Sequence, residues 1–406
     1  MKRGYLSQYF EGVAIKKLRA VEADFSRSNQ HELNGVSMLR NLLGSCRLND
    51  YPVRLIWLGG ESDIKTVHST VTWYNSRENQ THRSAEYRLY FKKNDVMDLA
   101  HEGDLLIAAK RPNGDFFMIV VPSGSTFESQ LLWLFGFSED YNLNTFKFRN
   151  IEENNLQINF AVRFILEELG IEIEEPEPDY LDSFLEPYYN VGFPTTAEFS
   201  ELSRQISKNV SPLEEPDNTL LQWIEQEERL FKRLERHIVS KRLDQGFSGD
   251  VDGFIAFSLS VQNRRKARVG YALENHLEEI FNKHNLTLSR GKETENKAKP
   301  DFIFPEIHSY RDPEFPSSKL TMLGVKSTCK DRWRQILSEA QRIQTKHLFT
   351  LEPSISINQT NEMQAKKVNL VLPQTLHNTY KEQQKKFLMN LKDFIKLVKN
   401  RQGQLG

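Results

Sequence analysis

Four short apolar runs, with one helical pattern among them, most constrain how the last third of this chain can fold. The runs are KPDFIFP, KLTMLGVKST, KHLFTLE and KVNLVLP, between residues 299 and 373. The pattern RWRQILSEAQRIQ stands between the second run and the third, and its apolar positions have helical spacing. Strands that alternate with helices are typical of an α/β domain, and we expect a mixed sheet here.

The region before these strands has a helical pattern. Residues 195–243 are expected to be helical, a further helix is expected over about 251–262, and another is expected to follow the basic segment NRRKAR. Apolar side chains recur on one face of the first of these regions, at Leu220, Ile224, Phe231, Leu234 and Ile238.

The first 150 residues have a different character. Runs such as YPVRLIWLG, TVHSTVTWYN, AEYRLYF, DLLIAAKR and DFFMIVVPSG are rich in β-branched and aromatic residues and are separated by Gly, Asn and Pro. Helical patches are expected near 9–20 and 127–135. We therefore predict a β-rich domain over 1–150 with the form of a small barrel or pseudobarrel. A proline-punctuated acidic linker is predicted over 151–190, and a second domain over 191–406.

Composition excludes several classes of protein. A chain of 406 residues is long enough for two domains. It has no apolar run near the roughly 20 residues that a membrane span needs, so we expect no membrane association. The two cysteines, Cys46 and Cys329, are too few for a disulfide framework. A reducing, cytoplasmic location is expected.

Charge is unevenly distributed although the formal net charge is only −1. Residues 151–190 carry eleven acidic side chains and one basic side chain. Residues 261–350 carry seventeen Lys or Arg against eleven Asp or Glu. Binding depends on the local patch rather than on the total, so the second region is a candidate nucleic-acid surface.

Two strands of the predicted sheet bring an acid and a base together. Asp301 begins an apolar strand, and Lys326 lies twenty-five residues further on, in the strand LTMLGVKST. A lysine in an apolar strand is costly to desolvate unless it meets a partner. Asp301 alone is better explained as a strand-start cap. The pair together is the working unit of metal-dependent nucleases with the PD-(D/E)XK pattern.

The second acid of that pattern is missing, because the position two residues before Lys326 is Gly324. Glu339 lies thirteen residues after Lys326, on the predicted helix, and can supply the missing carboxylate. Asp301 and Glu339 would then hold Mg²⁺ through hard oxygen ligands. Glu274, one helical turn before Glu278, is a candidate for a third carboxylate. Glutamates on an amphipathic helix are usually solvated, and Glu278 is expected to be a surface residue.

Basic side chains flank this site. Lys330, Asp331, Arg332 and Arg334 are suited to reading C·G pairs, because Arg and Lys recognise guanine and Asp accepts from cytosine. The segment NRRKAR offers phosphate contacts, from Asn263, Arg264, Arg265, Lys266 and Arg268. Arg334 could instead pair with an acid, and NRRKAR could be only a polar helix start.

These segments, over roughly residues 190–400, resemble the EcoRII family of type II restriction endonucleases. The resemblance implies an α/β/α nuclease domain that forms a homodimer and cleaves double-stranded DNA with Mg²⁺. It implies catalytic roles for Asp301, Lys326, Glu339 and Glu274, and for Tyr310 in HSYRDPEFP. The family has an arginine cluster near 222–227, where this chain has QWIEQEE.

The N-terminal half is more loosely similar to the effector-binding domain of that family, a DNA-binding pseudobarrel. The resemblance implies that a second DNA copy binds there and relieves autoinhibition, as in type IIE enzymes. The implied contacts come from NQHELNG and the segment WYNSRENQTHRSAEYR, through His31, Asn34, Tyr74, Arg77, Arg83, Glu86 and Arg88. The arginines and Glu86 could equally form ordinary cross-strand ion pairs.

The expected function is that of a sequence-specific restriction endonuclease of a restriction–modification system, with a CC–GG type of target. Two alternatives stay open. The absent acid at Gly324 is compatible with a DNA-binding regulator whose nuclease fold is degenerate, and a Mg²⁺ nuclease acting on repair structures or RNA is the third.

Overall fold

The computed structural model describes residues 4–23, 32–33, 37–60, 63–80, 82–138, 143–153, 156–171, 173, 180–329 and 332–403. The chain forms two compact units. Unit 1 comprises Met1–Ile173 and Ser354–Gln359, and unit 2 comprises Glu174–Pro353 and Thr360–Gly406. The division at 173/174 falls inside the acidic segment 151–190, between the short helices α4 Phe160–Glu168 and α5 Tyr180–Leu185.

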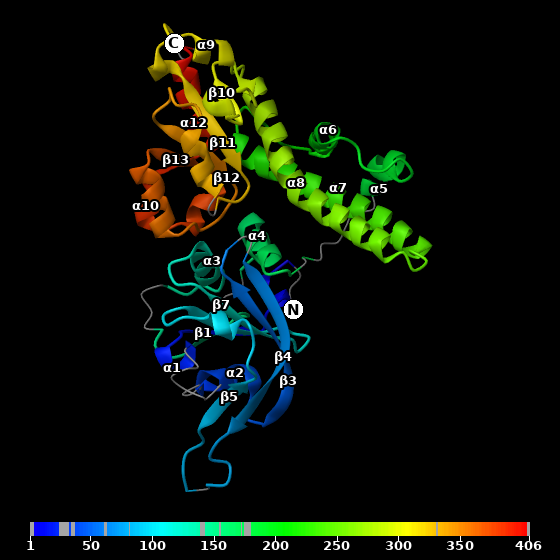
Figure 1. Cartoon of the computed structure of the whole chain (residues 1–406), viewed down its shortest axis with the longest axis vertical. Coiled ribbons are helices and arrows are strands. Elements are labelled where there is room, and N and C mark those ends of the chain that lie inside the picture. The colour runs from blue at the N-terminus through cyan, green and yellow to red at the C-terminus, as the bar shows by residue number, and fades with distance from the viewer. Residues whose placement is uncertain are drawn as a thin grey trace. The chain divides into compact units, whose positions relative to one another are not determined.

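Unit 1 is built on one eight-stranded sheet with the order β2-β5-β4-β3-β7-β6-β1-β8 (Figure 1). Its strands are β1 Gly12–Lys17, β2 Glu32–Leu33, β3 Leu48–Leu58, β4 Ile64–Asn75, β5 Tyr87–Phe91, β6 Leu105–Lys110, β7 Phe116–Val121 and β8 Lys147–Asn150. The five strands expected from the β-rich runs are confirmed as β3 to β7. Its longer helices are α3 Thr126–Leu134 and α4 Phe160–Glu168, with shorter α1 Ala20–Ala23 and α2 Arg40–Leu43.

Alternate residues of these strands enter two separate cores. Ile56 and Ile107 belong to a core that α3 and α4 cover, whereas Leu55 and Trp57 belong to a second core with Trp73 and residues of α2. Both faces of the sheet are thus buried at β1, β6 and β7, which explains why these strands are nearly continuous apolar runs.

The expected helix over 9–20 is wrong for most of its length. Residues Gly12–Lys17 form β1, which pairs antiparallel with both β6 and β8. Two rows of sheet hydrogen bonds to segments far away in the sequence outweigh the local helical pattern. The expected helix over 127–135 is confirmed as α3.

The helices of unit 2 differ from those expected: the region 195–243 is interrupted by residues 207–215, and the helix after it is longer than expected. α6 spans Thr196–Ile206, α7 spans Pro216–Gln245 and α8 spans Val251–Lys283; α7 and α8 form a long pair in Figure 1. The two helices expected on either side of residue 262 are therefore one continuous helix. The other helices are α5 Tyr180–Leu185, α9 Ile307–Arg311, α10 Ile357–Ala365, α11 Glu382–Lys385 and α12 Leu391–Arg401.

A six-stranded mixed sheet with the order β14-β13-β12-β11-β10-β9 forms the centre of unit 2. The strands are β9 Ser289–Arg290, β10 Phe302–Phe304, β11 Thr321–Lys326, β12 Lys346–Thr350, β13 Val368–Val371 and β14 Leu388–Met389. β9, β10 and β11 are antiparallel, whereas β11 to β14 run parallel. The four expected strands are confirmed as β10 to β13.

The pairing register separates the two faces of this sheet. Phe302 pairs with Leu323 and Leu323 pairs with His347, so these side chains share one face. On that face, Phe302 and Phe304 pack against Phe281 of α8, and Phe304 also packs against Phe394 of α12. Because side chains alternate along a strand, Gly324 and Lys326 lie on the opposite face.

The segment after β11 differs from the expected α-helix over 332–344. It forms a 3₁₀ helix, η7, over Arg332–Ser338, and Glu339 follows immediately after its end. Ile336 of η7 packs so closely on β11 that a Cβ atom on Gly324 would lie 2.6 Å from Ile336 Cγ2. No helix within the described residues is long and apolar enough to cross a membrane.

Candidate active site

Asp301 and Lys326 lie next to each other where β10 begins and the neighbouring strand β11 ends. Asp301 directly precedes β10, and Lys326 is the last residue of β11. Lys326 Nζ lies 3.4 Å from Asp301 Oδ2, and the same oxygen accepts a 2.6 Å hydrogen bond from the backbone N–H of Val325. Both side chains are about one-fifth exposed, so the pair is open to a ligand.

Glu339 completes this group from the segment after η7. Burial and the negative charge of Asp301 raise the pKa of Glu339 to about 7, while the charges of Lys326 and Lys346 oppose this rise. Charge interactions weaken with distance, so the influence of Asp301 and Lys326 on this pKa indicates that Glu339 lies near them. Its Oε2 atom is buried and has no hydrogen-bond partner among the described residues.

Glu274 enters the site from α8. Burial and the charge of Asp301 raise its pKa, and Arg290 of β9 opposes this. Arg290 Nη2 lies 3.0 Å from Glu274 Oε2, and Arg290 Nη1 lies 2.7 Å from Glu278 Oε2. The two glutamates are thus neither merely solvated nor unpaired, because one arginine joins them.

The donor set suits a divalent cation that has few protein ligands. No three His, Cys, Asp or Glu side chains among the described residues come together as a ready-made metal cage. Mg²⁺ normally keeps several waters and binds one or two carboxylates together with substrate phosphates. The buried, unpartnered Glu339 Oε2 beside Asp301 is a polar atom that such a cation would satisfy.

Tyr310 does not contact the Asp301–Lys326 pair through its hydroxyl group. The Tyr310 hydroxyl lies 2.6 and 2.7 Å from the carboxylate oxygens of Glu295, to which it donates. The side chain is buried, and burial and Glu295 raise the pKa of Tyr310. This geometry gives Tyr310 a supporting position next to the Glu339 segment.

The residues expected to contact DNA from α8 are mostly engaged with neighbouring segments. Arg265 Nη2 lies 2.5 Å from Glu235 Oε2 on α7, and Arg268 is buried and paired with Glu228. The Arg264 guanidinium stacks 4.4 Å from the Phe193 ring. Asn263 is exposed, and the side chain of Lys266 lies outside the described residues.

The candidate base-reading residues are placed only in part. Lys330 and Asp331 lie outside the described residues, and Arg332 is exposed at the start of η7. Arg334 pairs with Glu362 at 2.7 Å, which is the alternative that the sequence left open for it.

The candidate effector residues of unit 1 come together on the β4–β5 pair. Tyr74 and Arg88 are paired across the two strands; Tyr74 donates a hydrogen bond to Glu32, and Arg88 Nη1 lies 3.0 Å from Glu32 Oε2. Glu86 pairs with both Arg77 and Arg88. Arg83 donates to Gln80, and His31 and Asn34 lie outside the described residues.

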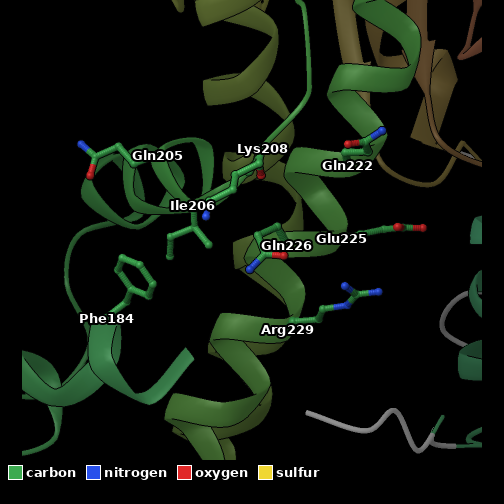
Figure 2. Close-up of a pocket in the computed structure, with 9 residues that line it drawn as sticks. Phe184, Gln205, Ile206, Lys208, Gln222, Glu225, Gln226 and Arg229 are labelled. Atoms are coloured by element: carbon green, nitrogen blue, oxygen red, sulfur yellow. The ribbon is translucent and has the colours of Figure 1, made fainter. Parts of the chain in front are cut away.

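A separate cleft of about 590 Å³ lies among α5, α6 and α7 (Figure 2). The segment QWIEQEE contributes Gln222, Glu225 and Gln226 to its lining, whereas Trp223 and Glu227 are buried. Lys208 and Arg229 also line it. The lining of the cleft mixes these polar side chains with Phe184 and Ile206, and it includes neither Asp301 nor Lys326.

Three residues of the site were missed from the sequence: Arg290, Glu295 and Lys346. Lys346 has the signal that identified Lys326, since it is a lysine at the start of an apolar strand and is buried. Arg290 and Glu295 have no comparable signal, because their partners are brought to them by the fold.

Comparison with known proteins gives one family match. Residues 231–395 match the family described as EcoRII C terminal. The type II restriction enzyme EcoRII of Escherichia coli is 43% identical over 208 residues. The match covers 51% of this chain and 51% of that enzyme, so the chain spans about half the length of the curated relative it matches.

Two solved structures have a weaker likeness. Metal-depleted Ecl18kI in complex with uncleaved, modified DNA has a TM-score of 0.44 at 15% identity and covers 56% of this chain and 84% of its own. The PspGI–substrate DNA complex has a TM-score of 0.44 at 15% identity and covers 53% of this chain and 96% of its own.

Proposed function

Because residues 231–395 form an EcoRII-like C-terminal domain, we propose that this chain is a type II restriction endonuclease. It hydrolyses phosphodiester bonds of double-stranded DNA at a specific sequence, with Mg²⁺ as the cation and a target of the CC–GG type. The observation that carries this proposal is the Asp301–Lys326 pair beside the unpartnered oxygen of Glu339.

Each side chain of the site has a role in this proposal. Asp301 and Glu339 would hold Mg²⁺, and Lys326 would orient the attacking water and offset phosphate charge. Glu274 assists through its carboxylate, which Arg290 holds, and Tyr310 supports the Glu339 segment. The cation, when bound, polarises the phosphate and lowers the pKa of its bound water. The mixed sheet with its flanking helices supports assignment to the α/β/α PD-(D/E)XK fold.

DNA contacts of unit 2 are proposed for two surfaces. Lys330, Asp331 and Arg332 read bases beside the active site, with Arg334 released from Glu362. Asn263 and Lys266 contact phosphates, whereas Arg264, Arg265 and Arg268 would have to exchange their present partners for phosphate. A homodimer formed through unit 2 places one active site on each DNA strand.

Unit 1 is proposed to bind a second, effector copy of the DNA. Its eight-stranded sheet, with a separate core on each face, supports a pseudobarrel. The network of Tyr74, Arg77, Glu86 and Arg88 lies on one β-arm, with Arg83 and the His31–Asn34 segment expected nearby. Such a set of arginines and an acid suits reading of a DNA groove.

The test is cleavage of a plasmid library with purified protein and Mg²⁺, followed by run-off sequencing of the ends. We expect discrete fragments whose ends share one short sequence. Binding to DNA without discrete fragments at any Mg²⁺ concentration would favour the degenerate regulator that Gly324 suggests. Cuts without a common duplex sequence would favour a repair or RNA nuclease.

A second prediction concerns autoinhibition. Deleting residues 1–173 removes unit 1 up to the division of the chain and keeps α5, whose Leu181 and Leu185 belong to the core with α7. We expect the shortened protein to cleave a single-site plasmid faster than the full chain does. Initial rates on one-site and two-site plasmids measure this, and a folded but slower or inert product contradicts autoinhibition.

A further inference from the structure

The turn that carries Glu339 has an unusually complete set of backbone hydrogen bonds. The N–H groups of residues 340 to 343 donate to Thr294 Oγ1, Glu295 Oε2, Tyr310 Oη and the carbonyl of Ala340. Ala340 has a φ of +47° and is fully buried. This backbone region is unfavourable for alanine, so contacts from elsewhere in the fold must hold the turn.

Lys346 holds the turn from the side of β12. Its ammonium group donates to the backbone carbonyls of Glu339, Ala340 and Ile343, the last two at 3.0 and 2.9 Å. The side chain is 6% exposed. A buried ammonium is costly unless its donors are satisfied, and here three carbonyls of one short turn satisfy all three N–H bonds.

Glu295 holds the turn from the segment that precedes Asp301. Its carboxylate accepts from the Tyr310 hydroxyl at 2.6 Å and from the backbone N–H of Gln341 at 3.3 Å. The Tyr310 hydroxyl in turn accepts from the N–H of Arg342 at 3.3 Å. The backbone immediately after Glu339 is thereby tied to the two segments that flank β10.

We propose that Glu295 and Lys346 are positioning residues, which fix the Glu339 turn so that its free carboxylate oxygen faces the cation shared with Asp301. This inference rests on the proposed function. The two residues act from β12 and from the segment before β10, which neighbour β11 and Asp301 respectively. The turn therefore has a fixed place relative to Asp301 and Lys326 before any cation binds.

The geometry separates this role from direct ligation by Glu295. Its carboxylate oxygens are already occupied by the Tyr310 hydroxyl and the Gln341 N–H, whereas Glu339 Oε2 is buried without a partner. Removal of a group that orients a metal ligand typically weakens metal binding by about 10–100-fold. A glutamine at 295 retains the oxygen acceptor and should largely preserve the turn.

The experiment measures Mn²⁺ binding to the full-length protein from the electron paramagnetic resonance signal of the free ion. We expect Glu295→Ala and Lys346→Met each to weaken Mn²⁺ binding by about 10–100-fold, while Glu295→Gln stays close to wild type. Glu293→Ala is the matched control, because Glu293 lies only two residues before Glu295 but forms an exposed ion pair with Lys299. Circular dichroism melting checks that each variant is folded.

The outcomes separate the inference from the function on which it rests. Folded Glu295→Ala or Lys346→Met protein that binds Mn²⁺ as tightly as wild type overturns the positioning role. Equal loss in Glu295→Ala and Glu295→Gln overturns it in favour of ligation by Glu295. Should Glu295→Ala not fold, Lys346→Met tests the same turn from its other side. If Glu339→Gln binds Mn²⁺ like wild type, it is the proposed active site that fails.

Discussion

Replacing Lys326 with methionine is expected to reduce DNA cleavage by about 10²–10⁴-fold, the usual contribution of a positioned proton-transfer group. Methionine keeps most of the side-chain volume but removes the ammonium that lies 3.4 Å from Asp301. The negative charge of Asp301, which raises the pKa of both Glu339 and Glu274, would then lose the positive charge that opposes it. The attacking water would also lose the group proposed to orient it.

Single-turnover cleavage of a supercoiled plasmid at saturating Mg²⁺ measures this effect. Lys319→Met is the matched control, because Lys319 is exposed on the short 3₁₀ helix Ser317–Lys319 that leads into β11. The control should cleave like wild type. A Lys326→Met protein that gives the wild-type fragments at the wild-type rate would remove Lys326 from the chemistry.

The pairing of Asp301 with Lys326 could be predicted because it depends on strands, which the sequence marks clearly. A proline–aspartate at one strand start and a lysine at the end of an apolar run place both groups at one edge of a sheet. The cost of burying an unpaired lysine then requires a partner. These arguments use only local patterns and the pairing of two strands that follow one another in the sequence.

The conformation of the Glu339 segment could not be predicted in the same way. The spacing from Lys326 indicated the residue but suggested an α-helix, whereas the structure has η7 and then the turn. Non-local contacts explain this difference. Ile336 packs on Gly324. The backbone groups of the turn form hydrogen bonds with the side chains of Glu295, Tyr310 and Lys346. β1 illustrates the same limit, because its pairing with β6 and β8 overrides a helical pattern.

Gly324 occupies the position at which the PD-(D/E)XK pattern has an acid, and it also packs against η7, the segment that precedes the replacement acid Glu339. A Cβ atom at this position would lie 2.6 Å from Ile336 Cγ2, which is far inside van der Waals contact. Any side chain here must push Ile336 and η7 away from β11, and Glu339 follows η7 directly. We therefore expect an aspartate at 324 to reduce cleavage rather than to restore the common pattern.

Gly324→Ala isolates the steric part of this argument. We expect it to lower the free energy of unfolding by about 1–3 kcal/mol, as overpacking does, and to weaken cleavage at limiting Mg²⁺.

In an Ile336→Ala background the Gly324→Ala substitution should leave the free energy of unfolding almost unchanged, since the clashing methyl group is absent. Urea unfolding of the four proteins of this cycle measures the coupling, expected at about 0.5–3 kcal/mol. Gly270→Ala is the control, because no atom lies within 4 Å of its would-be Cβ on α8, and alanine there should stabilise by about 0.5–1 kcal/mol. If Gly324→Ala lowers the free energy of unfolding equally with and without the Ile336 side chain, close packing at Gly324 does not hold η7. The absence of an acid at 324 would then be unrelated to the position of Glu339.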